Sequence, residues 1–279
     1  MFAPSILPRL GVDMPVVPSG TYAEGVISTS ATADAKDKSA AIDATAQAIT
    51  VVTTTPKRVA TRLEIALEDV AAVGQANFEA MLRQNISLAS LALSDKLDDL
   101  GLNGKSADPE ITGIFGRLTD PSAPAAEVAD FDKFLETVVA GIDGLWGCEM
   151  GHLNVVVNPE TYRHSQTTFR DIASADAGDI SFGTYAASKL GAWWTNKRMP
   201  AKASHVAQAI LYRSGRRLEG GSRGMRTAVC PVWSRGIAVD DIFSGSAKGE
   251  RYYTLSALIG DVILVQPDAY EQVAFRLSS

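Results

Sequence analysis

The sequence predicts an α+β protein in which one long helix is combined with strands from both halves of the chain. Residues 67–100 carry the strongest helical periodicity, residues 21–60 contain two runs rich in β-branched residues, and strand-like runs return over 237–277. The 279 residues are 46% hydrophobic and 21% charged, which is typical of a globular protein with a core. The chain therefore predicts one large domain or two closely associated ones.

The charge and the apolar content argue against several functional classes. A net charge of −6 is unlike that of a protein that grips nucleic acid over its whole surface. No apolar run reaches the roughly 18 residues of a membrane helix, and residues 1–20 lack the layout of a signal peptide. Cys148 and Cys230 are too few for a disulfide framework or a four-ligand metal site, so we interpret them as buried hydrophobic side chains and expect no cofactor.

Residues 1–20 predict an extended arm. Four prolines disfavour a helix in this stretch, and apolar side chains stand between them. Such an arm lies across another surface, either that of its own domain or that of a neighbouring subunit. We favour the neighbouring subunit.

Residues 21–60 predict a long β-hairpin. Residues 22–29 and 48–55 have the composition of strands, and the small and charged residues 31–40 between them form a polar tip. Few large side chains are available to bury either face, and a two-stranded ribbon is marginal alone in water. A neighbouring molecule is therefore expected to supply the missing surface.

Residues 67–100 predict a single helix that ends at Gly101, with Gly104 close behind. Its apolar residues recur at steps of three, four and, once, five, while polar residues fill the other face. At about 1.5 Å per residue, such a helix is roughly 50 Å long, far longer than the average helix of about 11 residues. We interpret it as a structural girder.

The remainder of the chain predicts a mixed region followed by strands. A helix over 131–143 precedes a short buried strand over 153–157, and another helix begins at Pro159 and runs to about 169. Further strands are expected over 206–213, 227–232, 237–240, 252–265 and 270–277.

Two glycine-rich stretches resemble catalytic motifs only superficially. Residues 101–106 have two residues between their glycines where a phosphate-binding loop needs four, and a helix precedes them instead of a strand. Ser222 has the spacing of a nucleophile elbow, but a strand follows it and no histidine lies downstream. His152, His164 and His205 lack the spacing of metal ligands. We therefore expect no enzyme activity.

A basic loop surrounds the second stretch. Its arginines are Arg213, Arg216, Arg217, Arg223 and Arg226. They could pair with acidic residues of a neighbouring subunit, bind an anion or remain solvated. Trp193 and Trp194 could form a binding platform, but packing in a core or an interface is the favoured interpretation.

The order of these parts resembles that of the major capsid proteins of tailed bacteriophages, the Hong Kong 97 type. Residues 88–104 running into 109–115 are similar to the family's helix that ends in Leu-Asn-Gly and is followed by Pro-x-x-x-Gly-Ile. Residues 153–159 resemble its core strand ending in Asn-Pro, and residues 262–270 resemble its C-terminal strand with a Pro-x-Ala-aromatic step. The resemblance covers nearly the whole chain.

This resemblance implies a Hong Kong 97-type α+β capsid fold, with an N-terminal arm, an extended β-hairpin loop, a long spine helix, and peripheral and axial domains. The arm would be residues 1–20 and the extended loop residues 21–60. The peripheral domain would hold the spine helix within 61–125 and receive the return strands of 239–265. The axial domain would comprise residues 126–238, with residues 266–279 as its C-terminal strand.

The implied function is that of a major capsid protein, which self-assembles as hexamers and pentamers into the icosahedral head shell of a tailed phage around double-stranded DNA. An encapsulin-type nanocompartment and a gene-transfer-agent or prophage shell are the alternatives. The implied partners are other copies of the chain, a portal, a scaffold or maturation protease encoded elsewhere, and a possible decoration protein. The DNA would be bound without sequence specificity, no membrane is involved, and the protein would reside in the virion after assembly in the host cytoplasm.

The resemblance also implies two groups of contact residues. The tip of the extended loop, which would lie on an adjacent subunit, holds Asp34, Lys36, Asp37 and Lys38. The candidates for the capsomer axis are Arg216, Arg217, Arg223 and Arg226.

Two departures from the family refine these expectations. Some members crosslink a lysine of the extended loop to an asparagine of the peripheral domain. Lys36 or Lys38 could supply the lysine, but residues 243–251 contain no asparagine, so a non-covalent shell is expected. The chain also begins directly at the arm, so we expect either a separate scaffold protein or a Met1 that follows a cut or an engineered start.

Overall fold

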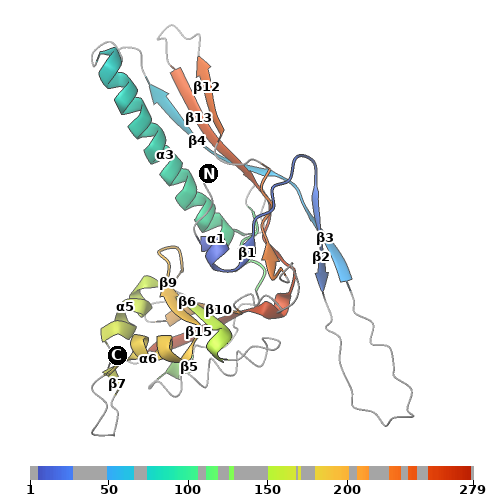
Figure 1. The fold of residues 1–279 in the computed structure, drawn as a ribbon, viewed down its shortest axis with the longest axis vertical. Helices are drawn as coiled ribbons and strands as arrows, with labels where there is room; N and C mark the ends of the chain where they lie inside the picture. The colour runs from blue at the N-terminus through green and yellow to red at the C-terminus, as the bar shows by residue number, and fades with distance from the viewer. Residues whose placement is uncertain are drawn as a thin grey trace, which may run out of the picture. The chain divides into compact units, whose positions relative to one another are not determined.

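The computed structural model of the chain describes the following residues (Figure 1): 6–27, 49–65, 74–105, 111–118, 126–128, 150–167, 169–170, 180–200, 206–213, 226–233, 238–243 and 251–277. Their contacts divide the chain into two compact units. The first unit draws on residues 1–22, 53–116 and 229–262, and the second on residues 23–52, 117–228 and 263–279.

The first unit is built on a three-stranded sheet in the order β12-β13-β4. The middle strand, β13 (Arg251–Ile259), pairs antiparallel with β4 (Lys57–Ile65) along its whole length. On its other side it pairs antiparallel with β12 (Ala238–Phe243). Strands far apart in the sequence therefore form the frame of this unit.

The long helix α3 (Gln75–Asn103) runs beside this sheet, as Figure 1 shows. Phe78 of the helix and Tyr253 of β13 are both buried where the two elements meet. Three partly buried side chains complete the contact: Leu63, Met81 and Leu82. The apolar stripe expected from the sequence thus faces the sheet.

Helix α3 confirms the expected long helix but differs from it at both ends. It begins at Gln75, after Gly74 with a φ of 78°, and the expected start at residues 67–73 lies outside the described residues. The expected stop at Gly101 is wrong, because the helix continues through Gly101 to Asn103, and Gly104 is its C-cap residue. A Cβ atom on Gly101 would lie 2.7 Å from Leu7 Cδ1, so this glycine admits a neighbouring side chain to the helix surface.

The N-terminal segment packs onto this same unit. It forms α1 (Ile6–Arg9), which contacts α3, and the short strand β1 (Val12–Asp13). Ile6, Leu7 and Leu10 are fully buried, and the Ile6 backbone N–H donates to Asp98 Oδ1 at 3.2 Å. This segment is therefore part of the core of the first unit.

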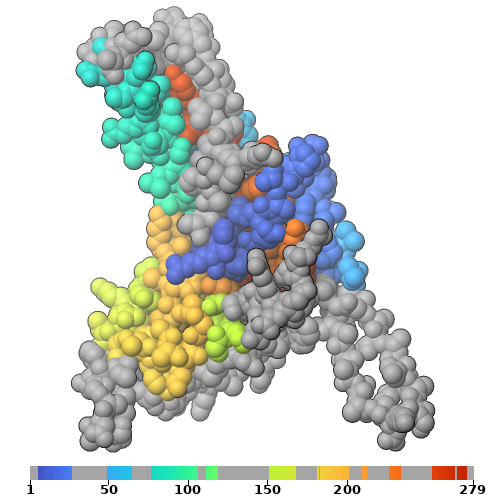
Figure 2. Space-filling view, viewed as in Figure 1, coloured from blue at the N-terminus to red at the C-terminus, as the bar shows by residue number. Residues whose placement is uncertain are grey.

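Backbone hydrogen bonds fix the residues that follow. Cys230 N–H donates to the Asp13 carbonyl at 2.8 Å, and Val232 N–H donates to the Pro15 carbonyl at 3.0 Å. Val17 N–H returns a bond to the Val232 carbonyl at 2.8 Å. In Figure 2 the N-terminal segment accordingly crosses the surface as a blue strip beside orange residues.

Two expectations for the arm are wrong over residues 6–17. A short helix forms despite the prolines, because Pro8 lies in the first turn of α1, where a backbone N–H has no partner within a helix. The apolar side chains of α1 are also buried on their own chain instead of on a neighbouring subunit. Residues 1–5 lie outside the described residues.

The second unit is built on a five-stranded sheet in the order β5-β15-β10-β6-β9. Strand β10 (Val206–Arg213) pairs antiparallel with β15 (Tyr270–Leu277) and with β6 (Leu153–Val157). The parallel edge strands are β5 (Ala126–Val128), beside β15, and β9 (Ala192–Thr195), beside β6. Every residue of β6 is buried, which confirms the expected short buried strand.

Helices and short strands accompany this sheet. Helix α5 (Pro159–Thr167) confirms the helix expected after Asn158, and it contacts α6 (Phe182–Lys189), which the periodicity did not reveal. The Ser181 side chain accepts from Thr184 N–H at 3.2 Å and so caps α6. The other short elements of this part of the chain are η1 (Met150–His152), η2 (Pro267–Ala269), and the strands β7 (Phe169–Arg170) and β8 (Ile180–Ser181), which pair with each other. The short strands β11 (Ala228–Val229) and β14 (Ile263–Leu264) belong to a different sheet.

Three further expectations need correction or lie outside the description. The single strand expected over 252–265 is broken, because β13 ends at Ile259 and β14 begins at Ile263. The strand expected over 227–232 is reduced to β11 and a bridge at Val232. The helix expected over 131–143 lies outside the described residues.

The tandem tryptophans lie in the core of the second unit. Trp193 and Trp194, both in β9, are buried, which confirms the packing interpretation. Trp193 Nε1 donates to Ser165 Oγ at 3.2 Å, and Trp194 Nε1 donates to Tyr212 Oη at 2.9 Å. Both indole N–H groups are thus satisfied inside the core, as buried tryptophans require.

We expect Leu7→Ala to lower the free energy of unfolding by about 2–5 kcal/mol, because it leaves a cavity beside Gly101 in a fully buried site. Chemical denaturation followed by circular dichroism measures the loss. Val16→Ala, in the same segment but 54% exposed, is the control and should cost under about 1 kcal/mol. Equal losses in the two variants would contradict the burial of the N-terminal segment.

Candidate functional site: an exposed ribbon and its root

The most exposed apolar surface in the described part of the second unit lies on a two-stranded ribbon. Among the described strands, β2 (Tyr22–Ile27) and β3 (Ile49–Thr54) pair only with each other (Figure 1). Ile49 is 64% exposed and Val51 is 66% exposed. Because side chains alternate along a strand, these two lie on the same face of β3. The ribbon therefore presents an aliphatic strip that no described residue of this chain covers.

The two strands approach each other closely at a glycine. A Cβ atom on Gly25 of β2 would lie 3.3 Å from Ile49 Cγ2 of β3. Ile49 thus leans over the glycine, and the absence of a side chain there keeps the strip flat.

An ion pair joins the ribbon to the end of the basic loop. Arg226 Nη1 lies 3.8 Å from Glu24 Oε2. The Arg226 side chain is 49% exposed, so water screens this pair and its contribution to stability is small. Of the four arginines expected at a capsomer axis, Arg226 alone lies among the described residues, and it pairs with Glu24 of the ribbon.

The other expected contact residues lie outside the described residues. These are Asp34, Lys36, Asp37 and Lys38 of the loop tip, and Arg216, Arg217 and Arg223 of the basic loop. Their roles stay predictions.

A buried anchor follows the basic loop directly. The Thr227 carbonyl accepts from both Val265 N–H and Gln266 N–H at 3.0 Å, and Thr227 Oγ1 lies 2.9 Å from Tyr270 Oη. Tyr270 stacks on Tyr212 with ring centroids 6.4 Å apart. Burial raises the pKa of the Tyr270 phenol well above its ordinary value, so the group stays neutral and remains available for hydrogen bonding. The loop thus ends at a fixed point of the second unit.

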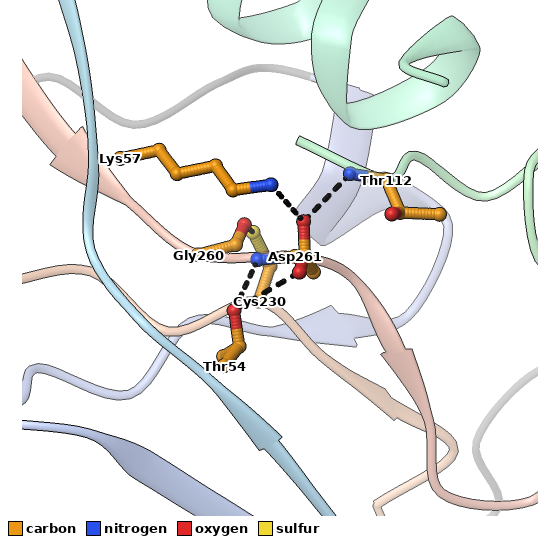
Figure 3. Close-up of polar contacts among 6 residues, drawn as sticks. All are labelled: Thr54, Lys57, Thr112, Cys230, Gly260 and Asp261. Atoms are coloured by element: carbon orange, nitrogen blue, oxygen red, sulfur yellow. Dashed lines mark hydrogen bonds and ion pairs between the residues drawn. The ribbon is translucent and has the colours of Figure 1, made fainter. Parts of the chain in front are cut away.

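Asp261 forms a polar centre in the first unit, beside Thr54, the last residue of β3 (Figure 3). We call this end of the ribbon its root. Its Oδ1 accepts from Lys57 Nζ at 3.3 Å and from Thr112 N–H at 2.7 Å. Its Oδ2 accepts from Thr54 Oγ1 at 3.2 Å, and its own backbone N–H donates back to Thr54 Oγ1 at 3.0 Å. One carboxylate therefore ties together the end of β3, the start of β4 and the segment that follows α3.

Sequence reasoning missed Asp261, which lies inside the run that was expected to form one continuous strand. A signal for it was present, since Gly260 and Asp261 interrupt an otherwise apolar stretch. Gly-Asp is a common break in a strand, and a charged residue in such a break needs partners if the site is partly buried.

Cys230 lies beside this centre but is not a reactive thiol. It is fully buried, and its Sγ donates to the Gly260 carbonyl at 3.6 Å. Burial, and to a lesser extent the charge of Asp261, raise the pKa of the thiol to about 12. The thiol is therefore protonated at neutral pH and unsuited to nucleophilic attack.

The described residues contain no group of three or more His, Cys, Asp or Glu side chains placed to hold a metal ion. Among their helices, none combines the length and the apolar character needed to cross a membrane.

We expect Asp261→Ala to lower the free energy of unfolding by about 1–3 kcal/mol, because the Lys57 amine and the Thr112 N–H lose their acceptor in a partly buried site. Urea denaturation measures the change. Asp99→Ala is the control: Asp99 pairs with Lys96 at 3.6 Å and accepts from Asn103 Nδ2 at 3.0 Å, both within α3 and within reach of water, so its loss should be about 1 kcal/mol or less. A smaller effect at Asp261 than at Asp99 would contradict the central role of Asp261.

Comparison with known families and proteins gives no match by sequence, since neither a family model nor a curated protein matches the chain. Comparison with solved structures does give matches that span the chain. The capsid of an empty gene-transfer-agent particle is similar with a TM-score of 0.66 and 16% identity, over 99% of this chain and 91% of the other.

Two further structures extend this likeness. The capsid of the Myoviridae phage XM1 has a TM-score of 0.62 and 10% identity, covering 99% of this chain and 93% of its own. A virus-like particle from Pyrococcus furiosus has a TM-score of 0.54 and 8% identity, covering 94% of this chain and 90% of its own. All three likenesses span nearly the whole chain, and the chain therefore has the Hong Kong 97-type capsid fold that its sequence predicts.

Proposed function

We propose that this chain is a shell-forming subunit, a major capsid protein that assembles with copies of itself into an icosahedral particle. The observation that carries the proposal is the likeness of 99% of the chain to particle capsids, at TM-scores of 0.66 and 0.62. The proposed function is mechanical and involves no catalysis. It requires surfaces that become buried only when subunits meet.

The ribbon supports this role because of its exposed aliphatic strip. Ile49 and Val51 are each about two-thirds exposed in the single subunit. Burying such a side chain against a neighbour contributes about 1.5–3 kcal/mol when the burial is complete. Each contact is modest, but a closed symmetric shell repeats it at every subunit, so that many weak contacts are satisfied together.

The finer identity we propose is the head shell of a tailed phage, built of hexamers and pentamers around double-stranded DNA. The net charge of −6 suits a wall that encloses DNA without adhering to it. A gene-transfer-agent shell is the second candidate, supported by the likeness to such a capsid. An encapsulin-like compartment is the third, supported by the likeness to the Pyrococcus furiosus particle.

The content of particles purified from the source cells distinguishes these candidates. Nuclease-protected DNA of one long, uniform size supports a phage, whereas short mixed fragments of host DNA support a gene-transfer agent. Particles filled with protein and free of DNA support the encapsulin-like compartment.

The proposal includes the contact residues expected from the sequence. Asp34, Lys36, Asp37 and Lys38 would rest on an adjacent subunit, and Arg216, Arg217, Arg223 and Arg226 would line the capsomer axis. Residues 61–125 with 239–265 would form the peripheral domain, and residues 126–238 with 266–279 the axial domain. A portal, a scaffold or maturation protease, and a decoration protein are the further proposed partners.

We expect Val51→Asp to abolish shells without unfolding the subunit, because it places a charge in the strip that a neighbour must cover. The matched control is Thr50→Asp, which adds the same charge to the exposed residue directly before Val51, on the opposite face of β3. Size-exclusion chromatography and negative-stain electron microscopy measure assembly, and circular dichroism checks folding. Shells from Val51→Asp at the wild-type yield would refute the role of the strip.

We expect deletion of residues 34–40 to prevent shell formation while leaving a folded subunit, because the loop tip would lose its contact with the adjacent subunit. The same microscopy measures the outcome, and a replacement of residues 34–40 by a glycine-serine segment of equal length separates loop length from loop chemistry. Normal particles from the deletion variant would show that the tip is dispensable.

A further inference from the structure

We infer that Thr54, Trp233 and the Gly260–Asp261 step form a clamp that holds both roots of the β2–β3 ribbon at one place in the first unit. The inference rests on the proposed assembly and deepens it, because it names residues that position the ribbon without lying on its exposed strip. The roots are Gly20, which precedes β2, and Thr54, which ends β3.

The root at Thr54 is held by reciprocal hydrogen bonds with Asp261. Thr54 is only 4% exposed, whereas the preceding residues of β3 are mostly exposed. Its hydroxyl donates to Asp261 Oδ2 at 3.2 Å and accepts from Asp261 N–H at 3.0 Å. Asp261 is held in turn by Lys57 and by the Thr112 N–H. The end of β3 is therefore fixed to a residue that is itself anchored from two other segments.

The root at Gly20 is held by the indole N–H of Trp233. Trp233 Nε1 donates to the Gly20 carbonyl at 2.8 Å. Gly20 has a φ of +80°, a conformation that favours glycine and that turns the chain from the N-terminal segment toward β2. Trp233 itself is tied to the sheet, since its backbone N–H donates to the Leu258 carbonyl of β13 at 3.0 Å.

Gly260 brings the two roots together. A Cβ atom on this residue would lie 2.9 Å from Thr54 Cγ2, 2.9 Å from the Trp233 ring at Cζ3 and 2.8 Å from Pro231 Cγ. The side chains that hold the two roots thus meet over one residue without a side chain. Gly260 N–H also donates to the Pro231 carbonyl at 2.8 Å, which fixes the backbone at this point.

The clamp restricts the separation of the two ribbon strands. A two-stranded ribbon is marginal on its own, so its strands separate easily unless their ends are held. Holding both roots restricts the strands before any neighbour binds. The ordering entropy that association would otherwise lose is then smaller, which is the advantage of a preorganised binding element.

The test compares Thr54→Val, Trp233→Phe and the double variant with the wild-type chain. Thr54→Val keeps the shape of the side chain and removes the hydroxyl, and Trp233→Phe keeps an aromatic ring and removes the N–H donor. The control is Thr53→Val, the same change at the exposed neighbour of Thr54. Hydrogen–deuterium exchange on unassembled subunits reports on β2 and β3 directly, with the amides of β10 and β15 as an internal measure of folding.

We expect exchange in β2 and β3 to be about five- to tenfold faster in the double variant, with no change in β10 and β15, because each lost hydrogen bond releases one root. The yield of shells in negative-stain microscopy should fall at least about fivefold, and Thr53→Val should match the wild type in both measurements.

Each outcome decides a separate point. Unchanged exchange in β2 and β3 of the double variant overturns the clamp. Faster exchange with a wild-type yield of shells overturns its role in assembly. Faster exchange in a chain whose wild-type form makes no particles keeps the clamp and overturns the proposed function.

Discussion

A ribbon of two strands has no second layer of its own, so whatever apolar side chains it carries must be covered by something else. In this chain the strip of Ile49 and Val51 is left open, while the end of the same strand is buried and hydrogen-bonded to Asp261. The contrast between an open strip and a fixed root runs along six residues of β3. The strand is therefore held by hydrogen bonds at one end and exposed over most of its remaining length.

The N-terminal residues meet the same need for burial in a different way. Ile6, Leu7 and Leu10 are as apolar as the ribbon, yet they find cover on α3, where Gly101 leaves room for Leu7. Backbone hydrogen bonds with Cys230 and Val232 then hold the residues that follow, and Trp233 holds Gly20. Among the described residues up to Thr54, the N-terminal segment therefore completes the subunit, whereas the ribbon keeps an exposed strip that we propose is covered by other copies. Cys230, buried beside Asp13 and Gly260, contributes to this packing.

The sequence predicts those features of the fold that depend on a single run of residues. The continuous apolar run of β6, the periodicity of α3, the proline at the start of α5 and the β-branched runs of the ribbon all express local physics. The errors arise where an element depends on contacts with residues that are distant in the sequence. Gly101 lies inside the helix and leaves room for Leu7, and the break after β13 places Asp261 beside Thr54, Lys57 and Thr112. No window of sequence contains both members of these pairs, so spacing and composition alone do not reveal the root of the ribbon.

The pairing of β4 with β13 has a consequence for the making of the protein. Ile65 pairs with Arg251, so the ribosome adds roughly 190 residues after β4 before its partner strand exists, which takes about 10–40 s at ordinary rates of translation. Throughout that interval the nascent chain carries an unpaired strand and the apolar face of α3. Because unpaired strands and exposed apolar surface promote aggregation, the nascent chain is more prone to aggregate before β13 has been made than after it.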